Sequence, residues 1–497
     1  MDTLNTPQSY AALASGLAVY LIIRKWLSRR GSDMSRVREA PASHWFWGHE
    51  LQAFESPDSQ FFLKNSENLG SAYKIKGAWH VVGTADVYRA WAQNEQNWWK
   101  SAILRPIVAR IAGRSVVWAE GKEHTRQRQA LLPFFTAEQV RSMEEDIKSC
   151  SDRMVATLRD HIAALPPSSH PPVIDVLPWT SRATLDVIGV VGFGYDFQCG
   201  DSPAARIISQ TWSAQSMLMT QFPAFVGMKL LQAFPLLNKV PFEALKAQER
   251  MRDMIKDLAR NVYWEQKGSR AGEEKQGRDL LSRLMRMKDA HGMDLEELLE
   301  QMCAFFIAGR ETTGTALAFS LLELGRHPEI QSRLRQELLD FGREPTYADF
   351  QATKLPYLDA VCKEILRVYP AIVQVERVAL CDDVLPLRFP ITTTDGERIN
   401  SIRVKKDQIV SINAFAINRN KAIWGPDADV YRPERWLDPE TLPPSSKLPS
   451  GIYGLTSFGL GTRLCLGYRL ALLEWKIILC DFVKNFEFTE TTEKLET

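Results

Sequence analysis

Residues 458–467 read FGLGTRLCLG, a glycine-rich loop that contains Cys465 and leads directly into the apolar stretch LGYRLALLEWKIIL. This stretch has helical periodicity, so we expect Cys465 to lie at the start of a helix. Backbone N–H groups and the helix dipole at that end favour a thiolate, and the glycines let the backbone pass close to a bulky group. A sulfur in such a place can bind iron. Cys480 lies inside the apolar helix instead, a position typical of an ordinary core cysteine.

The composition of the chain limits the classes of protein to which it can belong. Its 497 residues are 45% hydrophobic and 24% charged, which predicts a globular protein with a large core. With 61 Lys+Arg against 60 Asp+Glu, the net charge is +1 and gives no reason to expect nucleic acid as a ligand.

The 7 cysteines include no CxxC pair, which favours reduced thiols in a cytosol-facing protein. The 8 histidines form no HExxH motif, so a zinc enzyme is not expected.

The N-terminal residues have the pattern of a membrane anchor. Residues 10–23 are nearly all apolar, and Arg24 and Lys25 follow at once. As a helix this run is about 21 Å long, shorter than the ~30 Å hydrocarbon core unless Trp26 and the snorkelling basic side chains extend it. A cleaved signal peptide would have basic residues before the apolar run, whereas Asp2 precedes it here. The positive-inside rule then predicts a catalytic body in the cytoplasm. A buried amphipathic helix is the remaining alternative.

The chain is expected to have a simple domain organisation. We expect residues 1–30 to form the anchor, residues 31–50 a polar linker and residues 51–497 a single catalytic domain. Residues 165–172 and 267–277 have the composition of exposed loops, and both are too short to separate further domains.

The fold class follows from the hydrophobic periodicity. Most of residues 120–375 has helical periodicity, while the β-branched pieces at 79–87 and 408–417 predict strands. The fold is therefore expected to be mainly α with a minor β part. One long helix is predicted over residues 294–326, because Asp294 begins a capping-box pattern and a proline follows the end.

The cysteine loop matches every specified position of the pattern FxxGxRxCxG and so resembles the haem-binding loop of the cytochrome P-450 family. The family's other motifs follow in its usual order over about residues 40–488. The resemblance implies the cytochrome P-450 fold, haem b as cofactor, Cys465 as the axial ligand of the iron, and haem contacts from Phe458 and Gly459. Within the family, the chain is similar to the microsomal, long-chain eukaryotic type and to fungal members.

The stretch AFFIAGRETTGT at residues 304–315 resembles the family's oxygen-side motif (A/G)Gx(D/E)T(T/S). Ala308 and Thr312 share a helix face, where the hydroxyl can compete for the carbonyl one turn earlier and open a groove beside the haem. The resemblance implies that Thr312 and Glu311 deliver protons to bound oxygen and that Ala308 borders the haem. Without the cysteine loop, these residues would indicate only helix packing and a solvated carboxylate.

The string KEILRVYP at residues 363–370 places Glu364 and Arg367 on one helix among apolar residues, where an ion pair is costly unless it is fully hydrogen-bonded. It resembles the family's ExxR motif, and YRPERW at residues 431–436 resembles the family's PERF segment. The resemblance implies a structural cluster of Glu364, Arg367 and Arg435 behind the cysteine loop. An isolated ExxR would predict only a surface pair.

The two propionates of a haem require cationic donors, for which arginine is the natural choice. The resemblance implies three candidates, which are Arg463 in the cysteine loop, Arg377 in VERVAL and Arg128 in GKEHTRQRQALLPFF. Many family members have tryptophan four residues before the last of these arginines, and His124 replaces it here. A histidine can also donate a hydrogen bond to a propionate, although it differs in size, and a surface helix face is the alternative.

The resemblance implies a monooxygenase that inserts one oxygen atom of O2 into a lipophilic small molecule. Its electrons would come from NADPH through a separate NADPH–cytochrome P-450 reductase, with cytochrome b5 as a second candidate partner. The implied location is the endoplasmic reticulum membrane, with the catalytic domain facing the cytoplasm. Two alternatives remain, an O2-independent isomerase or dehydratase and a haem-binding sensor without turnover. Glu311 and Thr312 argue against both.

The substrate cannot be identified from the sequence beyond its lipophilic class. Residues 217–241 are strongly apolar and are expected to line a substrate entrance, to dip into the bilayer or to pack in the core. By resemblance, Phe305, Ile372, Val373 and the segment 103–111 occupy places that border the substrate pocket.

Overall fold

The computed structural model describes residues 32–41, 44–56, 60–77, 81–85, 95–101, 104–166, 171–240, 242–269, 279–287 and 292–491. The anchor predicted at residues 1–30 lies outside the described residues. Within the described ranges, no helix is both long enough and apolar enough to cross a bilayer. Part of the predicted linker packs against the body, since the Asp33 carboxylate accepts hydrogen bonds from the backbone and the guanidinium of Arg403.

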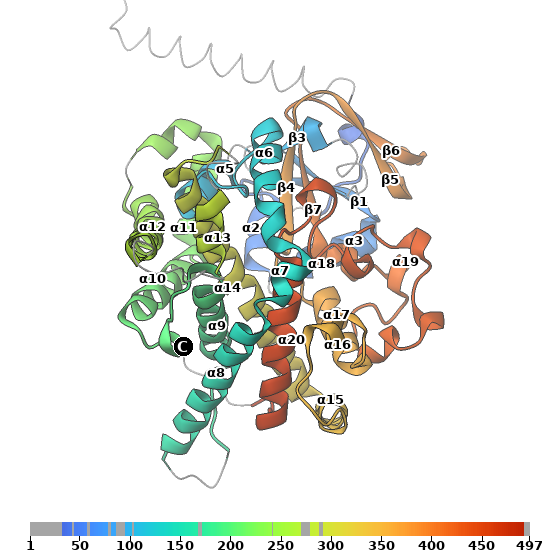
Figure 1. Cartoon of the computed structure of the whole chain (residues 1–497). Helices are drawn as coiled ribbons and strands as arrows, with labels where there is room; N and C mark the ends of the chain where they lie inside the picture. Colours follow the sequence, from blue (N-terminus) through green and yellow to red (C-terminus); the bar gives the residue numbers. More distant parts are fainter. Residues whose placement is uncertain are drawn as a thin grey trace, which may run out of the picture. The chain divides into compact units, whose positions relative to one another are not determined.

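Two compact units make up the described structure. The described residues of Met1–Ser101 and of Gln374–Asn420 form the first unit, and those of Ala102–Val373 and of Lys421–Thr497 form the second. All the described strands belong to the first unit, whereas the second is built from helices (Figure 1). The prediction of a mainly helical fold with a minor β part is therefore confirmed.

A five-stranded sheet with the order β1-β2-β7-β4-β3 forms the centre of the first unit. Strand β2 pairs in parallel with β7, and the other neighbours are antiparallel. Strands β5 and β6 form a separate antiparallel pair. The elements of this unit are η1 (Asp33–Ser35), α2 (His49–Glu55), α3 (Gln60–Leu69), β1 (Ala72–Lys76), β2 (Val81–Ala85), η3 (Glu95–Asn97), β3 (Trp98–Trp99), β4 (Gln374–Ala379), β5 (Asp383–Thr392), β6 (Arg398–Val404), β7 (Ile409–Asn413) and α18 (Ala414–Asn418).

The strand predicted at residues 408–417 is partly wrong. Strand β7 ends at Asn413, whose side chain accepts a hydrogen bond of 2.7 Å from the N–H of Ala416 and so begins helix α18. Both elements are buried, so the apolar run continues across the boundary and gives no periodicity that separates strand from helix.

The helices of the second unit surround α14, which α9, α12 and α20 contact (Figure 1). They are α5 (Leu104–Ala112), α6 (Gly121–Leu131), α7 (Ala137–Arg141), α8 (Glu144–Ala164), α9 (Val176–Val187), α10 (Pro203–Met219), α11 (Phe222–Ala233), α12 (Glu243–Ser269), α13 (Leu280–Met287), α14 (Leu295–Arg326), α15 (Pro328–Asp340), α16 (Tyr347–Gln351), α17 (Pro356–Val368), α19 (Lys421–Trp424) and α20 (Tyr468–Asn485). The shorter helical elements are η4 (Leu132–Phe135), the π-helix η5 (Ile188–Phe193), η6 (Gln198–Gly200), η7 (Pro235–Lys239), η8 (Pro433–Trp436), η9 (Pro439–Thr441), η10 (Ser445–Lys447), η11 (Ile452–Gly454) and η12 (Gly461–Arg463).

Helix α14 confirms the long helix predicted from the sequence. The Asp294 side chain caps it by accepting a 2.7 Å hydrogen bond from the N–H of Glu297, and its 32 residues end at Arg326. The Glu297 carboxylate forms an ion pair of 2.6 Å with Arg126 of helix α6. The start of α14 is thereby tied to the helix that contains two of the predicted haem-binding residues.

Small residues bring α9 and the start of η5 close to the middle of α14. A Cβ atom at Gly314 would lie 3.1 Å from the hydroxyl oxygen of Thr184, and one at Gly309 would lie 3.0 Å from the Ile188 side chain. The Thr184 hydroxyl also donates a 2.8 Å hydrogen bond to the carbonyl oxygen of Arg310. This close packing holds the oxygen-side motif in a fixed position.

Candidate functional site

The cysteine loop is a tight turn closed by its own backbone. The N–H of Cys465 donates a 2.7 Å hydrogen bond to the carbonyl oxygen of Phe458. Gly459 and Gly461 have φ angles of 74° and 61°, which an L-residue rarely adopts. A Cβ atom at Gly459 would also lie only 3.1 Å from the carbonyl oxygen of Arg463. The glycines are therefore needed to present the cysteine on this turn.

Helix α20 begins at Tyr468, so Cys465 lies just before the first helical turn. The N–H of Gly467, the residue that precedes the helix, donates a hydrogen bond to the Cys465 sulfur. The helix predicted after the loop is thus confirmed. The cysteine itself lies in the loop rather than in the helix.

Cys465 is accessible although it is surrounded by protein. It is exposed, whereas most of the other cysteines, including Cys480, are buried. Desolvation nevertheless raises the pKa of the Cys465 thiol, and the Gly467 N–H and the positive charge of Arg128 act in the opposite direction. A side chain that is both accessible and desolvated lines a concave site. The sulfur therefore faces a space that can receive a bulky group.

The middle of α14 has a second accessible position. Ala308 is exposed, although Phe306 and Thr313 on either side of it are buried. The Thr312 hydroxyl donates a 2.7 Å hydrogen bond to the carbonyl oxygen of Ala308. An exposed residue halfway along a central helix indicates an opening beside it.

Phe135 connects the cysteine loop with α14. Its ring packs edge-on against the Phe305 ring, with the centroids 5.3 Å apart. A Cβ atom at Gly467 would lie 3.7 Å from the same ring. One aromatic side chain therefore lies between the end of the cysteine loop and the oxygen-side motif.

Glu311 lies in a polar cluster that the sequence did not predict. Arg310 donates a hydrogen bond to its carboxylate, and Trp212 of helix α10 is a second donor. Desolvation raises the pKa of Glu311, while the charge of Arg310 and the two hydrogen bonds lower it. Trp212 is far from Glu311 in sequence, and no local pattern indicates their contact.

The arginines predicted to bind propionates have different surroundings. Arg463 donates a 2.9 Å hydrogen bond to the carbonyl oxygen of Ala119 and forms an ion pair with the buried carboxylate of Glu120. Glu120 is the residue that precedes helix α6. The sequence analysis missed this acid, which ties the cysteine loop to the start of α6.

Arg128 and His124 both lie on helix α6. His124 is buried, which is inconsistent with the alternative of a surface position, and Arg128 is near enough to affect the Cys465 thiol through its charge. Arg377 belongs to the other unit, on strand β4, where it is buried and donates a 2.7 Å hydrogen bond to the carbonyl oxygen of Glu376.

Glu364, Arg367 and Arg435 form one buried ion-pair cluster. Arg367 bonds both carboxylate oxygens of Glu364, at 2.9 and 2.8 Å, and Arg435 adds a bond of 2.9 Å. The N–H of Arg432 and the indole of Trp436 complete the set of donors, each at 2.9 Å. Every carboxylate lone pair is thus used, which is the condition for an ion pair to be tolerated away from water.

The cluster is also linked to the cysteine loop through the segment that precedes it. The Ser457 hydroxyl donates a 2.6 Å hydrogen bond to the carbonyl oxygen of Leu366, which lies on α17 between the two charged residues of the ExxR motif.

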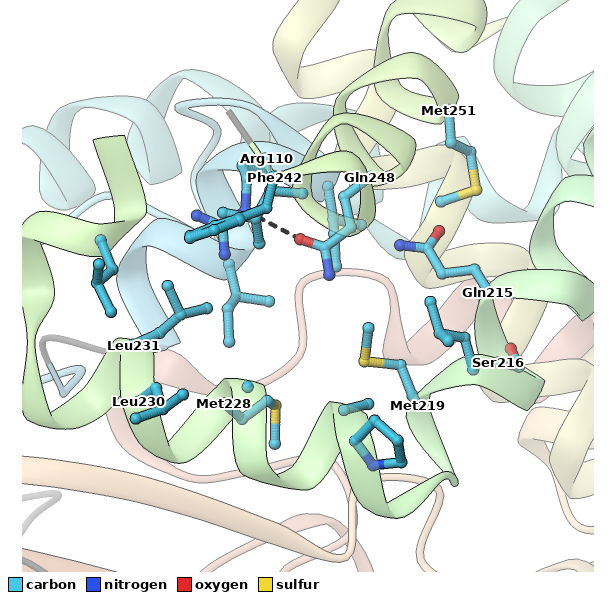
Figure 2. Close-up of a pocket in the computed structure, with 18 of the residues that line it drawn as sticks. Arg110, Gln215, Ser216, Met219, Met228, Leu230, Leu231, Phe242, Gln248 and Met251 are labelled. Atoms are coloured by element: carbon cyan, nitrogen blue, oxygen red, sulfur yellow. Dashed lines mark hydrogen bonds between the residues drawn. The ribbon is translucent and has the colours of Figure 1, made fainter. Parts of the chain in front are cut away.

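A cavity of about 760 Å³ lies among α5, α10, α11, η7 and α12 (Figure 2). Apolar side chains form most of its wall, and Arg110, Gln215 and Gln248 are polar exceptions. Its lining residues are Ile107, Arg110, Ile111, Trp212, Gln215, Ser216, Leu218, Met219, Pro223, Ala224, Gly227, Met228, Leu230, Leu231, Leu237, Phe242, Leu245, Gln248 and Met251. Its size lies within the range of pockets for drug-sized ligands.

The apolar segment at 217–241 therefore has a mixed environment. Met219 and Leu231 line the cavity, while Met217 and Leu236 are exposed. Simple core packing does not describe this segment. Of the positions expected to border a pocket, Ile107 and Ile111 line the cavity, Phe305 is buried and Ile372 is half exposed.

Comparison with known proteins agrees with this arrangement. The family description "Cytochrome P450" matches residues 39–497. The chain belongs to the cytochrome P450 family. Cytochrome P450 monooxygenase 205 of Postia placenta is 32% identical over 98% of this chain and 92% of its own length. Cytochrome P450 monooxygenase claQ of Ampulloclitocybe clavipes is 33% identical over 78% of this chain and 73% of its own. Ganoderic acid synthetase CYP5150L8 of Ganoderma lucidum is 32% identical over 77% of this chain and 74% of its own.

This P450 is accordingly a monooxygenase, and its family implies a haem cofactor, a redox partner and a small-molecule substrate. Its residues fit a haem. The accessible, desolvated sulfur of Cys465 and the exposed Ala308 both border open space, and Phe135 lies between the elements that contain them.

Proposed function

We propose that this P450 inserts one oxygen atom of O2 into a lipophilic small molecule bound in the cavity of Figure 2. One observation supports the proposal most strongly. Trp212 lines the apolar cavity and also donates a hydrogen bond to Glu311, the residue next to Thr312. Trp212 therefore connects the wall of the cavity with Glu311, one of the two predicted proton-delivery residues.

In this proposal Cys465 would hold the iron of a haem b through its sulfur, and Phe458 and Gly459 shape the loop that contains this cysteine. The bound haem supplies the redox chemistry that activates O2. Arg128, Arg463 and His124, all in the second unit, are the candidates for binding the propionates. The same role for Arg377, which belongs to the first unit, stays a prediction from the sequence. If Arg463 binds a propionate, its guanidinium must bind that propionate and the Glu120 carboxylate at the same time.

Proton supply is the proposed role of Thr312 and Glu311. The Thr312 hydroxyl donates its hydrogen to the Ala308 carbonyl, so its oxygen keeps lone pairs that can accept a hydrogen bond from a neighbouring donor. Burial raises the pKa of Glu311 toward the working pH, which favours a carboxyl group that can give up a proton and regain it. The structural role proposed for Glu364, Arg367 and Arg435 is to hold the polypeptide that supports the cysteine loop.

Electrons are proposed to come from NADPH through a separate cytochrome P-450 reductase, with cytochrome b5 as an alternative donor. We further propose that residues 1–30 anchor the chain in the endoplasmic reticulum membrane with the catalytic domain in the cytoplasm. The apolar run followed by Arg24 and Lys25 supports this location.

Oxygen labelling tests the proposed reaction. Purified enzyme, reductase and NADPH are incubated under 18O2 with a lipophilic compound selected by its effect on the haem spectrum. The proposal predicts one 18O atom per product molecule and no product without reductase. Conversion of an organic peroxide under nitrogen, without reductase, would instead assign the enzyme to the isomerase or dehydratase class.

A further inference from the structure

Arg110 is a buried cation in the wall of an otherwise apolar cavity. Its side chain is on helix α5, and the residue is only 7% exposed. Its Nε donates a 2.9 Å hydrogen bond to Gln248 of helix α12, shown in Figure 2, and its Nη1 donates a 3.0 Å bond to Asn238 of η7. Both partners are neutral amides. Among the described residues, Nη2 has no hydrogen-bond partner.

The charge of Arg110 is poorly compensated by the protein. Desolvation lowers the pKa of the guanidinium, and the charge of Glu249 acts in the opposite direction. Within the described residues, the side-chain partners of Arg110 are the amides of Gln248 and Asn238, and no carboxylate forms an ion pair with it. A buried charge without a counter-charge is unfavourable, and a guanidinium binds a carboxylate best through two parallel N–H groups. The Nη2 group can therefore donate to an anionic oxygen of a ligand, which the described residues do not supply.

The remaining wall of the cavity determines what else the ligand must contain. Leu231, Met219 and Met251 are typical of the apolar and adaptable side chains around it. Gly227 also faces open space, since nothing lies within 4 Å of a Cβ atom built there. A ligand that fits has a lipophilic body and one acidic group.

We propose that Arg110 is an anion-binding subsite of this cavity and that the enzyme takes lipophilic carboxylic acids as substrates. The substrate assignment rests on the proposed function, whereas binding of the acid does not. The carboxylate accepts hydrogen bonds from the Nη2 group of Arg110, and the lipophilic body lies along the apolar wall that includes Trp212.

The test compares acids with their uncharged esters. Dissociation constants are measured by equilibrium dialysis with the purified full-length haem-containing enzyme, so that no turnover is needed. The probes are hexadecanoic acid and methyl hexadecanoate, then abietic acid and methyl abietate as a polycyclic pair. The wild type should bind each acid about tenfold or more tightly than its ester, as expected for a charge-assisted bond in a desolvated site.

Three variants test whether the preference for the acid over its ester depends on Arg110. Arg110→Met should abolish the preference for the acid and leave ester binding within about twofold of the wild type. Gly227→Leu should weaken acid and ester equally, because it narrows the cavity without meeting a neighbouring atom at its Cβ. Arg250→Met, at an exposed position on α12 that pairs with Glu243, should leave the ratio unchanged.

Equal affinities for acid and ester in the wild type, or an acid preference that survives in Arg110→Met, would overturn the subsite. Oxygenation of neutral compounds without any acid preference would refute the subsite and leave the proposed function intact. An acid preference that depends on Arg110 in an enzyme that never incorporates 18O would support the subsite and refute the proposed function.

Discussion

The hydroxyl of Thr312 donates a 2.7 Å hydrogen bond to the carbonyl oxygen of Ala308, one turn earlier on α14. This bond fixes the direction of the hydroxyl at the point where the central helix borders open space. The neighbouring Thr313 is different, because it is buried and its hydroxyl has no hydrogen-bond partner among the described residues. The two adjacent threonines therefore form a matched pair for testing the proton-delivery role.

Thr312→Val should uncouple electron use from product formation. The side chain keeps its shape but loses the hydroxyl, so protons are no longer directed to the reacting oxygen. We expect unchanged haem content and substrate binding, more hydrogen peroxide per NADPH, and about tenfold less oxygenated product per NADPH. Thr313→Val should leave the product yield unaltered. Full coupling in Thr312→Val would rule out the proposed role.

Glu364→Ala should strongly destabilise the protein. It removes the shared acceptor of Arg367 and Arg435 and leaves both guanidinium groups buried, at an expected cost of about 3–5 kcal/mol in the free energy of unfolding. Calorimetry should show a lower Tm, and haem incorporation should fall. Glu243→Ala, which breaks an exposed ion pair with Arg250, serves as control and should leave both unchanged. Similar behaviour of the two variants would contradict the structural role of the cluster.

Glu474→Gln should change the pH dependence of stability. Glu474 lies buried in α20, and desolvation raises its pKa well above the ordinary value. Above the unfolded pKa, the unfolded chain loses this proton while the folded protein keeps it. Stability is therefore lost as pH rises toward the folded pKa, by up to about 1.4 kcal/mol per pH unit. The Tm of the variant should therefore rise relative to that of the wild type as the pH increases from about 5, above the ordinary pKa of a glutamate. A constant difference across this range would show that Glu474 does not titrate as inferred.

Removing residues 1–31 should release the enzyme from membranes. The full chain is expected to remain in the membrane fraction after a high-salt wash, whereas the form that begins at Ser32 should be largely extractable. Both forms should bind haem equally, which provides the control for folding. A full chain that is freely soluble after expression in a eukaryotic host would contradict the anchor.

Local sequence patterns predicted the parts of the site that are built from neighbouring residues. The cap at Asp294 and the proline after the last turn predicted α14, and the glycine-rich loop before an apolar helical stretch predicted the start of α20. The resemblance to a family predicted the partnership of Glu364 with Arg435, which periodicity alone could not have provided.

The sequence could not predict contacts between distant polar residues. The partners Arg463 and Glu120 are 343 residues apart, and Trp212 reaches Glu311 from another helix. Such pairs depend on tertiary packing and produce no periodic pattern in the sequence. Arg110 lies in the helix sequence LRPIVARIA, which also contains Arg105, and its lack of a counter-charge among the described residues is visible only in the folded protein.

The carbon monoxide spectrum of the reduced enzyme tests the central claim most directly, because the position of its band depends on whether a thiolate would hold the haem iron. The account predicts the red-shifted band typical of thiolate-bound haem in the wild type and in Cys480→Ala, whose cysteine is buried in α20. The band should be lost in Cys465→Ala. Persistence of the thiolate band in Cys465→Ala would contradict the assignment of Cys465 as the iron ligand and the site built around it.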